Sequence, residues 1–330
     1  MKDATGAAGD GGQPLPPARG QPATPPPRVA ILLATCNGAA WLPEQLDSIA
    51  AQTHPHWRVW ASDDGSRDAT PRILARYRAR WGPARLGARR GPCRGFAANF
   101  AALACDGAIE ADYFAYCDQD DIWEPDKLAR ALAALRPQPA ARPALYCSRT
   151  RLVDAQGRAI GHSPLFSRPP GFRNALVQNI GGGNTMVFNR AARRLLQRAG
   201  EVDVLTHDWW TYLVVSGCGG HVHYDPQPSL RYRQHAHNQV GMNATWPARI
   251  RRLGLMLRGR FRAWNSRNLD ALAALRPLLT EENRRVLDRF ALARDALLPH
   301  RLAGLVDAGI YRQTLAGNLG LAAAALLKKV

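Results

Sequence analysis

The stretch YFAYCDQDDIWEPDKL, residues 113–128, decides the fold, because a short apolar run in it ends at a cluster of acids. The apolar residues 113–117 are typical of a buried strand. Pro125 and Asp126 then indicate the start of a helix with leucines on its inner face. These leucines are Leu128, Leu132 and Leu135. The stretch therefore predicts a strand joined to a helix by an acidic turn.

Three carboxylates lie within four residues at the end of this strand, at Asp118, Asp120 and Asp121. Like charges this close repel one another, so the cluster is costly unless a cation sits among them. Oxygen ligands of this kind suit Mg²⁺ or Mn²⁺, ions that also bridge phosphates. The alternative from these residues alone is a solvated acidic turn, with Asp126 in the first turn of the helix.

The chain is strongly basic. Its 330 residues allow one large or two small domains, and 46% hydrophobic and 21% charged residues are ordinary for a globular protein. The net charge of +18 fits an anionic partner such as a nucleotide diphosphate, an acidic membrane face or nucleic acid. An arginine-rich composition without any such partner is the alternative.

Cysteine usage and the amino-terminal residues favour a cytoplasmic protein. The six cysteines are scattered without a C-x-x-C pair, which is typical of reduced core residues. We find no signal peptide and no apolar run of about 18 residues, the length that a membrane span needs. Residues 1–27 are rich in Gly, Pro and Ala without periodicity and predict a disordered tail.

Two strand–loop–helix units at the start of the folded region predict a doubly wound, mostly parallel α/β sheet flanked by helices. Residues 29–34 form a continuous apolar run, as expected of a central parallel strand, and a helix follows the loop TCNG. Residues 57–61 predict a second strand, and a second helix begins at Thr70. Ligands of such sheets bind at the carboxyl ends of the strands, where both loops fall.

These loops predict a nucleotide site built from side chains. They lack G-x-G-x-x-G and G-x-x-x-x-G-K-[ST], which argues against a dinucleotide-binding turn and excludes a P-loop. Asn37 and the pair Asp63 and Asp64 are left, and a carboxylate can accept the imide N–H of uracil or thymine. A turn with a helix cap further on is the alternative. Arg94, at a helix start in residues 94–100, favours a diphosphate or is a plain surface arginine.

The second half of the chain adds three polar motifs. Residues 178–185, QNIGGGNT, predict a glycine-rich turn that feeds a strand at 185–188, and the glycines allow either close approach to a ligand or a tight turn. Asp208 opens an apolar helix beside tryptophans, as a first-turn acid or as a general base at a pocket wall. The loop that holds His235 and Asn238 suggests a metal or phosphate role, or solvated histidines.

The region 246–330 predicts a helical carboxyl-terminal extension. Ile250, Leu253, Leu257 and Phe261 share one helix face and are interleaved with arginines. A basic amphipathic helix of this kind indicates binding to an anionic membrane surface, or else a helix packed on its own domain. Further helices are predicted at 269–279 and 282–298.

Residues 28–245 resemble family 2 glycosyltransferases, in the form found in the bacterial rhamnosyltransferase-like group. Five motifs in order carry the resemblance: VAILLATCNGAAWLPEQLDSIAAQTHPHWRVWASDDGSRDAT, CDQDDIWEPDKL, NIGGGNTMVFNR, HDWW and YRQHAHNQVG. The resemblance implies the GT-A fold and the inverting transfer of a sugar from a nucleotide diphosphate sugar. It implies dTDP-rhamnose as the donor and a glycan or lipid-linked polysaccharide precursor as the acceptor.

The resemblance also implies residue roles. Asp208 matches the catalytic base, Asp118 and Asp120 match the metal-binding pair, and Asp120 corresponds to the direct ligand of Mg²⁺ or Mn²⁺. The residues implied at the nucleotide sugar are Thr35, Asn37, Asp63, Asp64, Arg94, Asn99, Asp118, His235 and Asn238. Those implied at the acceptor pocket are Gly182, Gly183, Asn184 and Trp209. Asn184 stands where relatives often carry cysteine.

Two other classes of protein compete with a glycosyltransferase. A nucleotidyltransferase also uses paired carboxylates and a divalent ion, but it usually needs a basic, glycine-rich loop after the first strand, and TCNG is not such a loop. A nucleic-acid-binding protein would fit the charge of +18. Its usual pattern of aromatic residues interleaved with basic ones over a sheet face is missing, so no nucleic-acid partner is expected.

Overall fold

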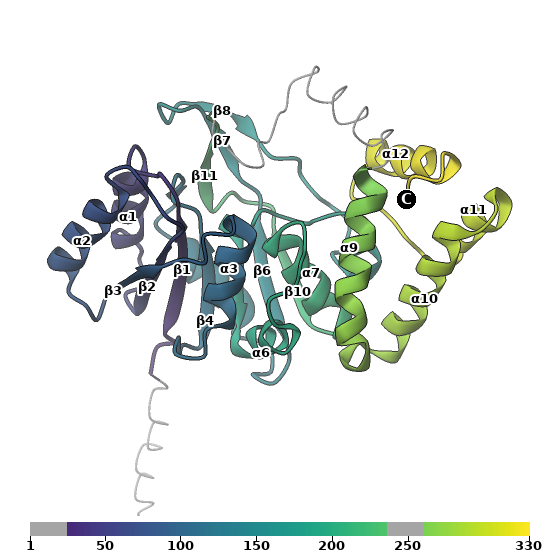
Figure 1. Ribbon diagram of the computed structural model, residues 1–330, viewed down its shortest axis with the longest axis horizontal. Helices are drawn as coiled ribbons and strands as arrows, with labels where there is room; N and C mark the ends of the chain where they lie inside the picture. The colour runs from purple at the N-terminus through teal and green to yellow at the C-terminus, as the bar shows by residue number, and fades with distance from the viewer. Residues whose placement is uncertain (1–24, 236–259) are drawn as a thin grey trace, which may run out of the picture.

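A computed structural model describes residues 25–235 and 260–330, and its centre is a seven-stranded sheet with the order β10-β6-β9-β4-β1-β2-β3 (Figure 1). The strands of this sheet are β1 (Val29–Thr35), β2 (Trp57–Asp63), β3 (Leu86–Arg90), β4 (Tyr113–Cys117), β6 (Ala144–Ser148), β9 (Val187–Asn189) and β10 (His221–Asp225). Strand β1 pairs in parallel with β2 and β4, and β9 is antiparallel to both of its neighbours. The predicted doubly wound, mostly parallel sheet is confirmed.

Strand β1 is buried on both faces, which explains its continuous apolar sequence. Side chains alternate along a strand, so Ala30 and Leu32 join one apolar core and Ile31 and Leu33 join the other. The helices of this part of the chain are α1 (Leu42–Ala50), α2 (Thr70–Trp81), α3 (Phe96–Cys105), α4 (Lys127–Leu135), α5 (Phe172–Ala175), α6 (Arg190–Ala199) and α7 (His207–Gly217). Helices α1, α2 and α4 contribute to the core that holds Ile31, and α3, α6 and α7 to the other.

A second, four-stranded sheet stands at the carboxyl ends of the main strands (Figure 1). Its strands, in spatial order, are β5 (Ile122–Trp123), β11 (Leu230–Arg233), β7 (Arg151–Val153) and β8 (Ala159–His162). Strand β5 directly follows the acidic turn and pairs with β11, so the turn is anchored to a strand more than a hundred residues away. The sequence does not predict β5, because a two-residue strand has no periodicity.

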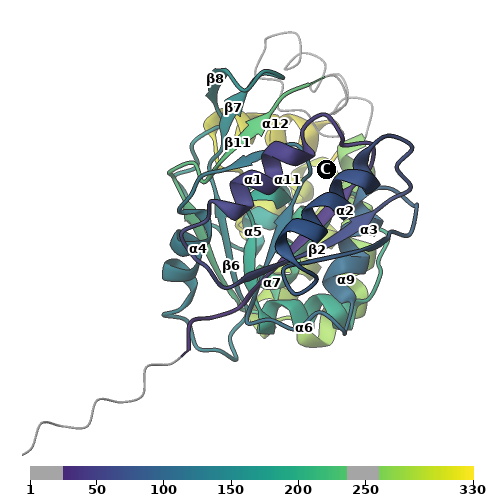
Figure 2. The ribbon, with the colours of Figure 1, turned by 90° about the vertical axis from the view of Figure 1, so that its left-hand side faces the viewer.

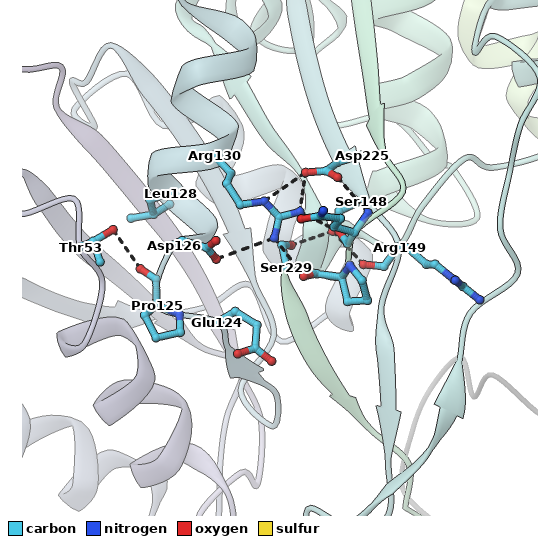
Figure 3. A network of polar contacts seen from close by, with 12 residues as sticks. Thr53, Glu124, Pro125, Asp126, Leu128, Arg130, Ser148, Arg149, Asp225 and Ser229 are labelled. Atoms are coloured by element: carbon cyan, nitrogen blue, oxygen red, sulfur yellow. Dashed lines mark hydrogen bonds and ion pairs between the residues drawn. The ribbon is translucent and has the colours of Figure 1, made fainter.

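Helix α4 is tied to the far edge of the main sheet by a polar network (Figure 3). Arg130 on α4 donates from Nε to the carboxylate of Asp225, at 3.2 Å, and the Tyr146 hydroxyl donates to the same oxygen at 2.8 Å. Although burial alone opposes ionisation, hydrogen bonds from the Gln227 N–H, Arg130 and Tyr146 lower the pKa of Asp225 below 3.8. The network therefore fixes the helix that follows the acidic turn.

The carboxyl-terminal helices are α9 (Arg260–Leu275), α10 (Glu281–Asp295), α11 (Leu298–Asp307) and α12 (Leu315–Leu326). Leu275, Phe290 and Leu305 belong to the same apolar core as Trp210 of α7. The predicted helix 282–298 is wrong at its end, because α10 stops at Asp295 before α11 begins. Of the predicted amphipathic face, Ile250, Leu253 and Leu257 lie outside the described residues. Within the described ranges we find no helix of the length and apolar character that a membrane crossing requires.

Candidate functional site

The acidic turn after β4 is the centre of the candidate site. The side chain of Asp118 is partly buried, and no donor in residues 25–235 and 260–330 forms a hydrogen bond with its carboxylate. Burial, together with the charges of Asp121, Asp120 and Asp208, raises the pKa of Asp118 well above its usual range. Within the described residues Asp118 is thus an acid without a hydrogen-bond donor, near the proposed base and both other acids of the turn.

Asp121 has a different environment, because donors from two distant segments satisfy it. It is fully buried and accepts hydrogen bonds from the Asn184 amide at 2.6 Å and from the Arg233 N–H at 3.3 Å. Burial and the charge of Asp120 raise the pKa of Asp121 to about 8. Asp121 therefore joins the turn to the glycine-rich segment and to β11, and the predicted acceptor residue Asn184 has its side chain directed at this acid.

The end of β11 lies against Asp120. His235 Nε2 is 2.8 Å from Asp120 Oδ2, and the imidazole stacks on the Trp41 ring with centroids 4.0 Å apart. The buried Arg233 donates to the backbone carbonyl of Asp120 at 3.0 Å and pairs with Glu44 of α1. The structure thus brings His235 to the predicted metal-binding acid. Its predicted companion Asn238 lies outside the described residues.

Lys127 lies behind the acidic turn, and the sequence analysis missed it. Its side chain is fully buried, and Nζ donates to the backbone carbonyl of Asn184 at 2.5 Å and lies 4.5 Å from the centre of the Trp123 ring. Burial lowers the pKa of Lys127 to about 7, against the opposing effect of Cys117, Asp121 and Asp118. Helical spacing could have indicated it, because Lys127 is four residues from the buried Ala131.

Asp208 lies in the first turn of α7 beside the glycine-rich segment. The Gly183 N–H donates to Asp208 Oδ2 at 3.0 Å, and the Trp209 N–H donates to Oδ1 at 2.6 Å. The predicted strand 185–188 is wrong at its start, since Gly183–Thr185 form a 3₁₀ turn before β9. The indole of Trp209 is buried and donates to the carbonyl of Ala175 at 2.7 Å. The backbone of this turn therefore orients Asp208, and the Trp209 ring points into the core.

His207 packs beneath the same turn, which the sequence analysis did not predict. The buried ring stacks on Phe100 with centroids 3.9 Å apart, and neither ring nitrogen has a hydrogen-bond partner in the described part of the chain. Burial lowers the pKa of His207 to about 4, so the imidazole is neutral at pH 7. A Cβ atom on Gly183 would lie 2.2 Å from His207 Nε2, so only glycine fits above the ring.

The loops after β1 and β2 hold each other through the predicted nucleotide residues. Asp63 accepts hydrogen bonds from the Thr35 hydroxyl at 2.9 Å and from the Ser66 hydroxyl at 2.6 Å. Asn37 has a φ of 51° and accepts from the Arg67 N–H at 2.8 Å. Thr35, Asn37 and Asp63 therefore lie together, as predicted, and their side chains bind neighbouring loop residues.

Asp64 caps the loop that precedes α3. Its carboxylate accepts from the Cys93 N–H at 2.6 Å and from the Gly95 N–H at 2.9 Å. The buried Asn99 donates to the Ser62 carbonyl at 2.9 Å, and its Oδ1 atom has no hydrogen-bond partner among the residues that the structure describes. Arg94 forms an exposed ion pair with Glu201 in this structure. Asp64 and Asn99 thus gather at the carboxyl end of β2, and a diphosphate contact by Arg94 stays a prediction.

Gln119, the residue between the two predicted metal-binding acids, bridges the ends of β4 and β1. Its Oε1 atom accepts from the Cys36 N–H at 2.8 Å, and its Nε2 atom donates to the Cys36 carbonyl at 2.9 Å. A Cβ atom on Gly38 would lie 2.1 Å from Gln119 Oε1. The spacer between the acids therefore fixes the distance between two strand ends.

The acids of the turn fit a divalent cation that phosphates help to bind. In the described part of the chain, no group of three or more His, Cys, Asp or Glu side chains is arranged to hold a metal ion. Two carboxylates are offered by Asp120 and by Asp118, which accepts no hydrogen bond from any described residue. Mg²⁺ is commonly bound by one or two carboxylates together with substrate phosphates, so two protein ligands are sufficient.

Comparison with known proteins agrees with this geometry. Residues 30–197 match the family model described as glycosyl transferase family 2. The chain is 30% identical over 253 residues to the dTDP-rhamnosyl transferase RfbG of Shigella flexneri. The match covers 73% of this chain and 84% of that protein.

Solved structures identify the fold. The crystal structure of residues 1–349 of S. aureus TarS in complex with UDP-GlcNAc has a TM-score of 0.51 at 14% identity and covers 85% of this chain and 89% of that one. The structure of GalNAc-T7 with UDP, GalNAc and Mn²⁺ has a TM-score of 0.53 at 12% identity and covers 87% and 56%. With its largely parallel sheet and its family match, the chain belongs to glycosyl transferase family 2 and has the GT-A fold.

Proposed function

We propose that this glycosyltransferase is an inverting, metal-assisted enzyme that transfers rhamnose from dTDP-rhamnose to a lipid-linked polysaccharide or O-antigen precursor. The sugar and nucleotide follow from the similarity to RfbG, whose name describes a dTDP-rhamnosyl transferase. The observation that carries the mechanism is the proximity of Asp208 to the acidic turn, where its charge acts on Asp118. A general base and a site for the departing diphosphate at the same edge of the sheet suit a reaction in which the acceptor hydroxyl displaces the diphosphate directly.

Asp118 and Asp120 are the residues that would hold Mg²⁺ or Mn²⁺ together with the diphosphate. The bound ion would supply charge neutralisation on the departing diphosphate. In the structure Asp120 forms a hydrogen bond with His235, whose ring stacks on Trp41. His235 can therefore hold the Asp120 carboxylate in one orientation, and both side chains would face the phosphates of the donor.

Asp208 is the proposed general base. Two backbone N–H groups, from Gly183 and Trp209, fix its carboxylate. A carboxylate so oriented can accept the proton of an acceptor hydroxyl while that oxygen attacks the anomeric carbon from the side opposite to the diphosphate. This single displacement inverts the anomeric centre without a covalent sugar–enzyme intermediate. Gly182, Gly183 and Asn184 would border the acceptor.

Asp64 is the proposed contact to the thymine base. Its two oxygens already hold the N–H groups of Cys93 and Gly95, but each carboxylate oxygen has a second lone pair for a base N–H. Thr35, Asn37, Asp63 and Asn99 would keep this loop in place. Arg94 would have to leave Glu201 to reach the diphosphate, and an exposed pair of this kind is worth only about 0–1 kcal/mol.

The proposal divides the chain into a tail at residues 1–27, a transferase domain at 28–245 and a basic helical region at 246–330. All six cysteines are free thiols, which suits the reducing cytoplasm. We place the enzyme there, at the inner face of the cell membrane, where a lipid-linked acceptor is available. The basic helical region would then contact the anionic lipid surface.

Calorimetric titration tests the proposal directly. Wild type, Asp120→Ala and the control Asp126→Asn would be titrated with dTDP-rhamnose and UDP-glucose, with Mn²⁺ and with a chelator. We expect Mn²⁺-dependent binding of dTDP-rhamnose that Asp120→Ala loses and that Asp126→Asn, altered at an exposed position at the start of α4, retains. Asp208→Asn should bind the donor and fail to transfer it. If neither nucleotide sugar binds to wild type, the proposal is wrong.

A further inference from the structure

Exposed apolar side chains gather on the carboxyl-terminal helices. Most of the large hydrophobic residues that are exposed in the described part of the chain lie between positions 292 and 327. The most regular group is on α12, where Leu315, Leu319 and Leu326 are 78%, 64% and 53% exposed. Their spacing of four and seven residues places them on one face of the helix, which we call the α12 stripe.

The α12 stripe is an additional apolar face of the helix, because the opposite face already supplies the contact with the core. Leu321, Ala324 and Ala325 pack into the main apolar core. No residue between Leu315 and Leu326 is charged. A contiguous exposed apolar surface without charged residues is uncommon on monomeric proteins and indicates an interaction site.

The charges around the α12 stripe indicate an anionic partner. Residues 308–330 contain Arg312, Lys328 and Lys329 and no acidic side chain. Neither lysine ammonium forms an ion pair with any residue of the described ranges. A second copy of a chain with a net charge of +18 would bring like charges together on this face. A bilayer with anionic headgroups offers both an apolar interior and the opposite charge.

The position of α12 also favours a membrane. Figure 1 shows α12 at the upper end of the molecule, where β7, β8 and β11 of the second sheet lie, and Figure 2 shows α12 at the same end as these strands. Strand β8 contributes another exposed apolar side chain, Ile160, which is 56% exposed. Because β5, which follows the acidic turn, belongs to the second sheet, a surface that contacts α12 would lie at the same end of the molecule as that turn.

We propose that the α12 stripe docks the protein on an anionic lipid bilayer, with α12 lying in the headgroup region and the candidate site turned toward the lipid. A helix of 12 residues is about 18 Å long, which suits a position along the interface. Lys328 and Lys329 extend the contact to the headgroups. The docking stands on α12 itself, and only its purpose, access to a lipid-linked acceptor, rests on the proposed function.

Flotation of the full chain with vesicles tests the docking. Vesicles of phosphatidylcholine with about one third phosphatidylglycerol would be compared with pure phosphatidylcholine vesicles. We expect wild type to float with the anionic vesicles. The bound fraction of the variant Leu315→Glu/Leu319→Glu should be more than about tenfold lower than that of wild type. Lys328→Gln/Lys329→Gln should lower the preference for phosphatidylglycerol.

The matched control is Ala75→Glu/Ala79→Glu, which adds the same two charges at exposed positions of α2. It should float like wild type. Circular dichroism and calorimetric donor binding would verify that each variant is folded. The docking is wrong if wild type binds neither vesicle, if the α12 variant floats like wild type, or if wild type is a dimer that the α12 variant dissociates. Donor binding and transfer to a water-soluble acceptor would survive all three outcomes, so they test the proposed function separately.

Discussion

Replacement of Gly183 by alanine is expected to damage both the stability and the activity of the enzyme. The new Cβ atom would lie 2.2 Å from His207 Nε2 and 2.9 Å from Cε1, whereas ordinary van der Waals contact begins near 3.4 Å. The ring and the turn must therefore separate by more than an ångström. The ring has little room to move, because it is buried and stacks on Phe100.

The expected magnitude follows from this displacement. Overpacking a closely packed site typically costs about 1–3 kcal/mol in the free energy of unfolding. Movement of the turn also displaces the Gly183 N–H, which orients the carboxylate of Asp208 at 3.0 Å. A misplacement of about 1 Å at a reacting group can cost roughly a hundredfold in rate. We therefore expect kcat to fall more than the stability alone would explain.

Urea unfolding and steady-state kinetics would measure the two effects, with Gly107→Ala as the control. Gly107 has no atom within 4 Å of an added Cβ, so its replacement should be nearly neutral. The double variant Gly183→Ala/His207→Ala removes the clash, and the imidazole nitrogens have no hydrogen bond to lose. It should therefore be more stable than the sum of the single changes by about 1–3 kcal/mol. Strict additivity, or a Gly183→Ala protein as stable as the Gly107 variant, would refute the reasoning.

Two further changes test the buried polar contacts. Lys127→Met is expected to lower the free energy of unfolding by about 1–3 kcal/mol, because the buried Asn184 carbonyl loses its donor, and equal urea midpoints for variant and wild type would contradict this. Asp225→Asn is expected to lower it by about 1–3 kcal/mol at pH 7 by weakening the bonds from Arg130 and Tyr146. Since the folded pKa of Asp225 is depressed, its contribution is complete above the unfolded value near 3.8 and is lost as the pH falls toward the folded value. Urea unfolding of both proteins between pH 3 and pH 7 should show the two curves converging at the acid end; a constant difference would count against the assignment.

Strands β1, β2 and β4 could be predicted because each is a local, largely apolar run in the sequence. The predicted strand 113–117 coincides with β4, and the acids that follow it stand at the edge where the other parallel strands end. The carboxyl ends of parallel strands lie at one edge of the sheet. The grouping of Asp63, Asp64 and Asp118 at this edge can therefore be predicted without knowing how the helices pack.

The rest of the site depends on partners far away along the chain. The bond between Lys127 and Asn184 spans 57 residues, and the bond between Asp121 and Arg233 spans 112. No periodicity connects such residues. Only the structure therefore shows that hydrogen-bond donors satisfy Asp121, whereas no described residue donates to Asp118. The stacking of His207 on Phe100 is of the same kind.

The double hydrogen bond between Gln119 and Cys36 has a consequence for attempts to change the donor specificity. Through its side-chain amide, Gln119 continues the pairing of β4 with β1 beyond the last paired backbone residues. Residue 38 is glycine, which leaves room for the Gln119 amide. Positions 38 and 119 are therefore coupled, and a library that varies position 38 alone would consist mostly of residues that clash with the Gln119 amide. A larger residue at 38 becomes accessible only together with a shorter one at 119, so recombination between relatives should exchange the two positions as a pair.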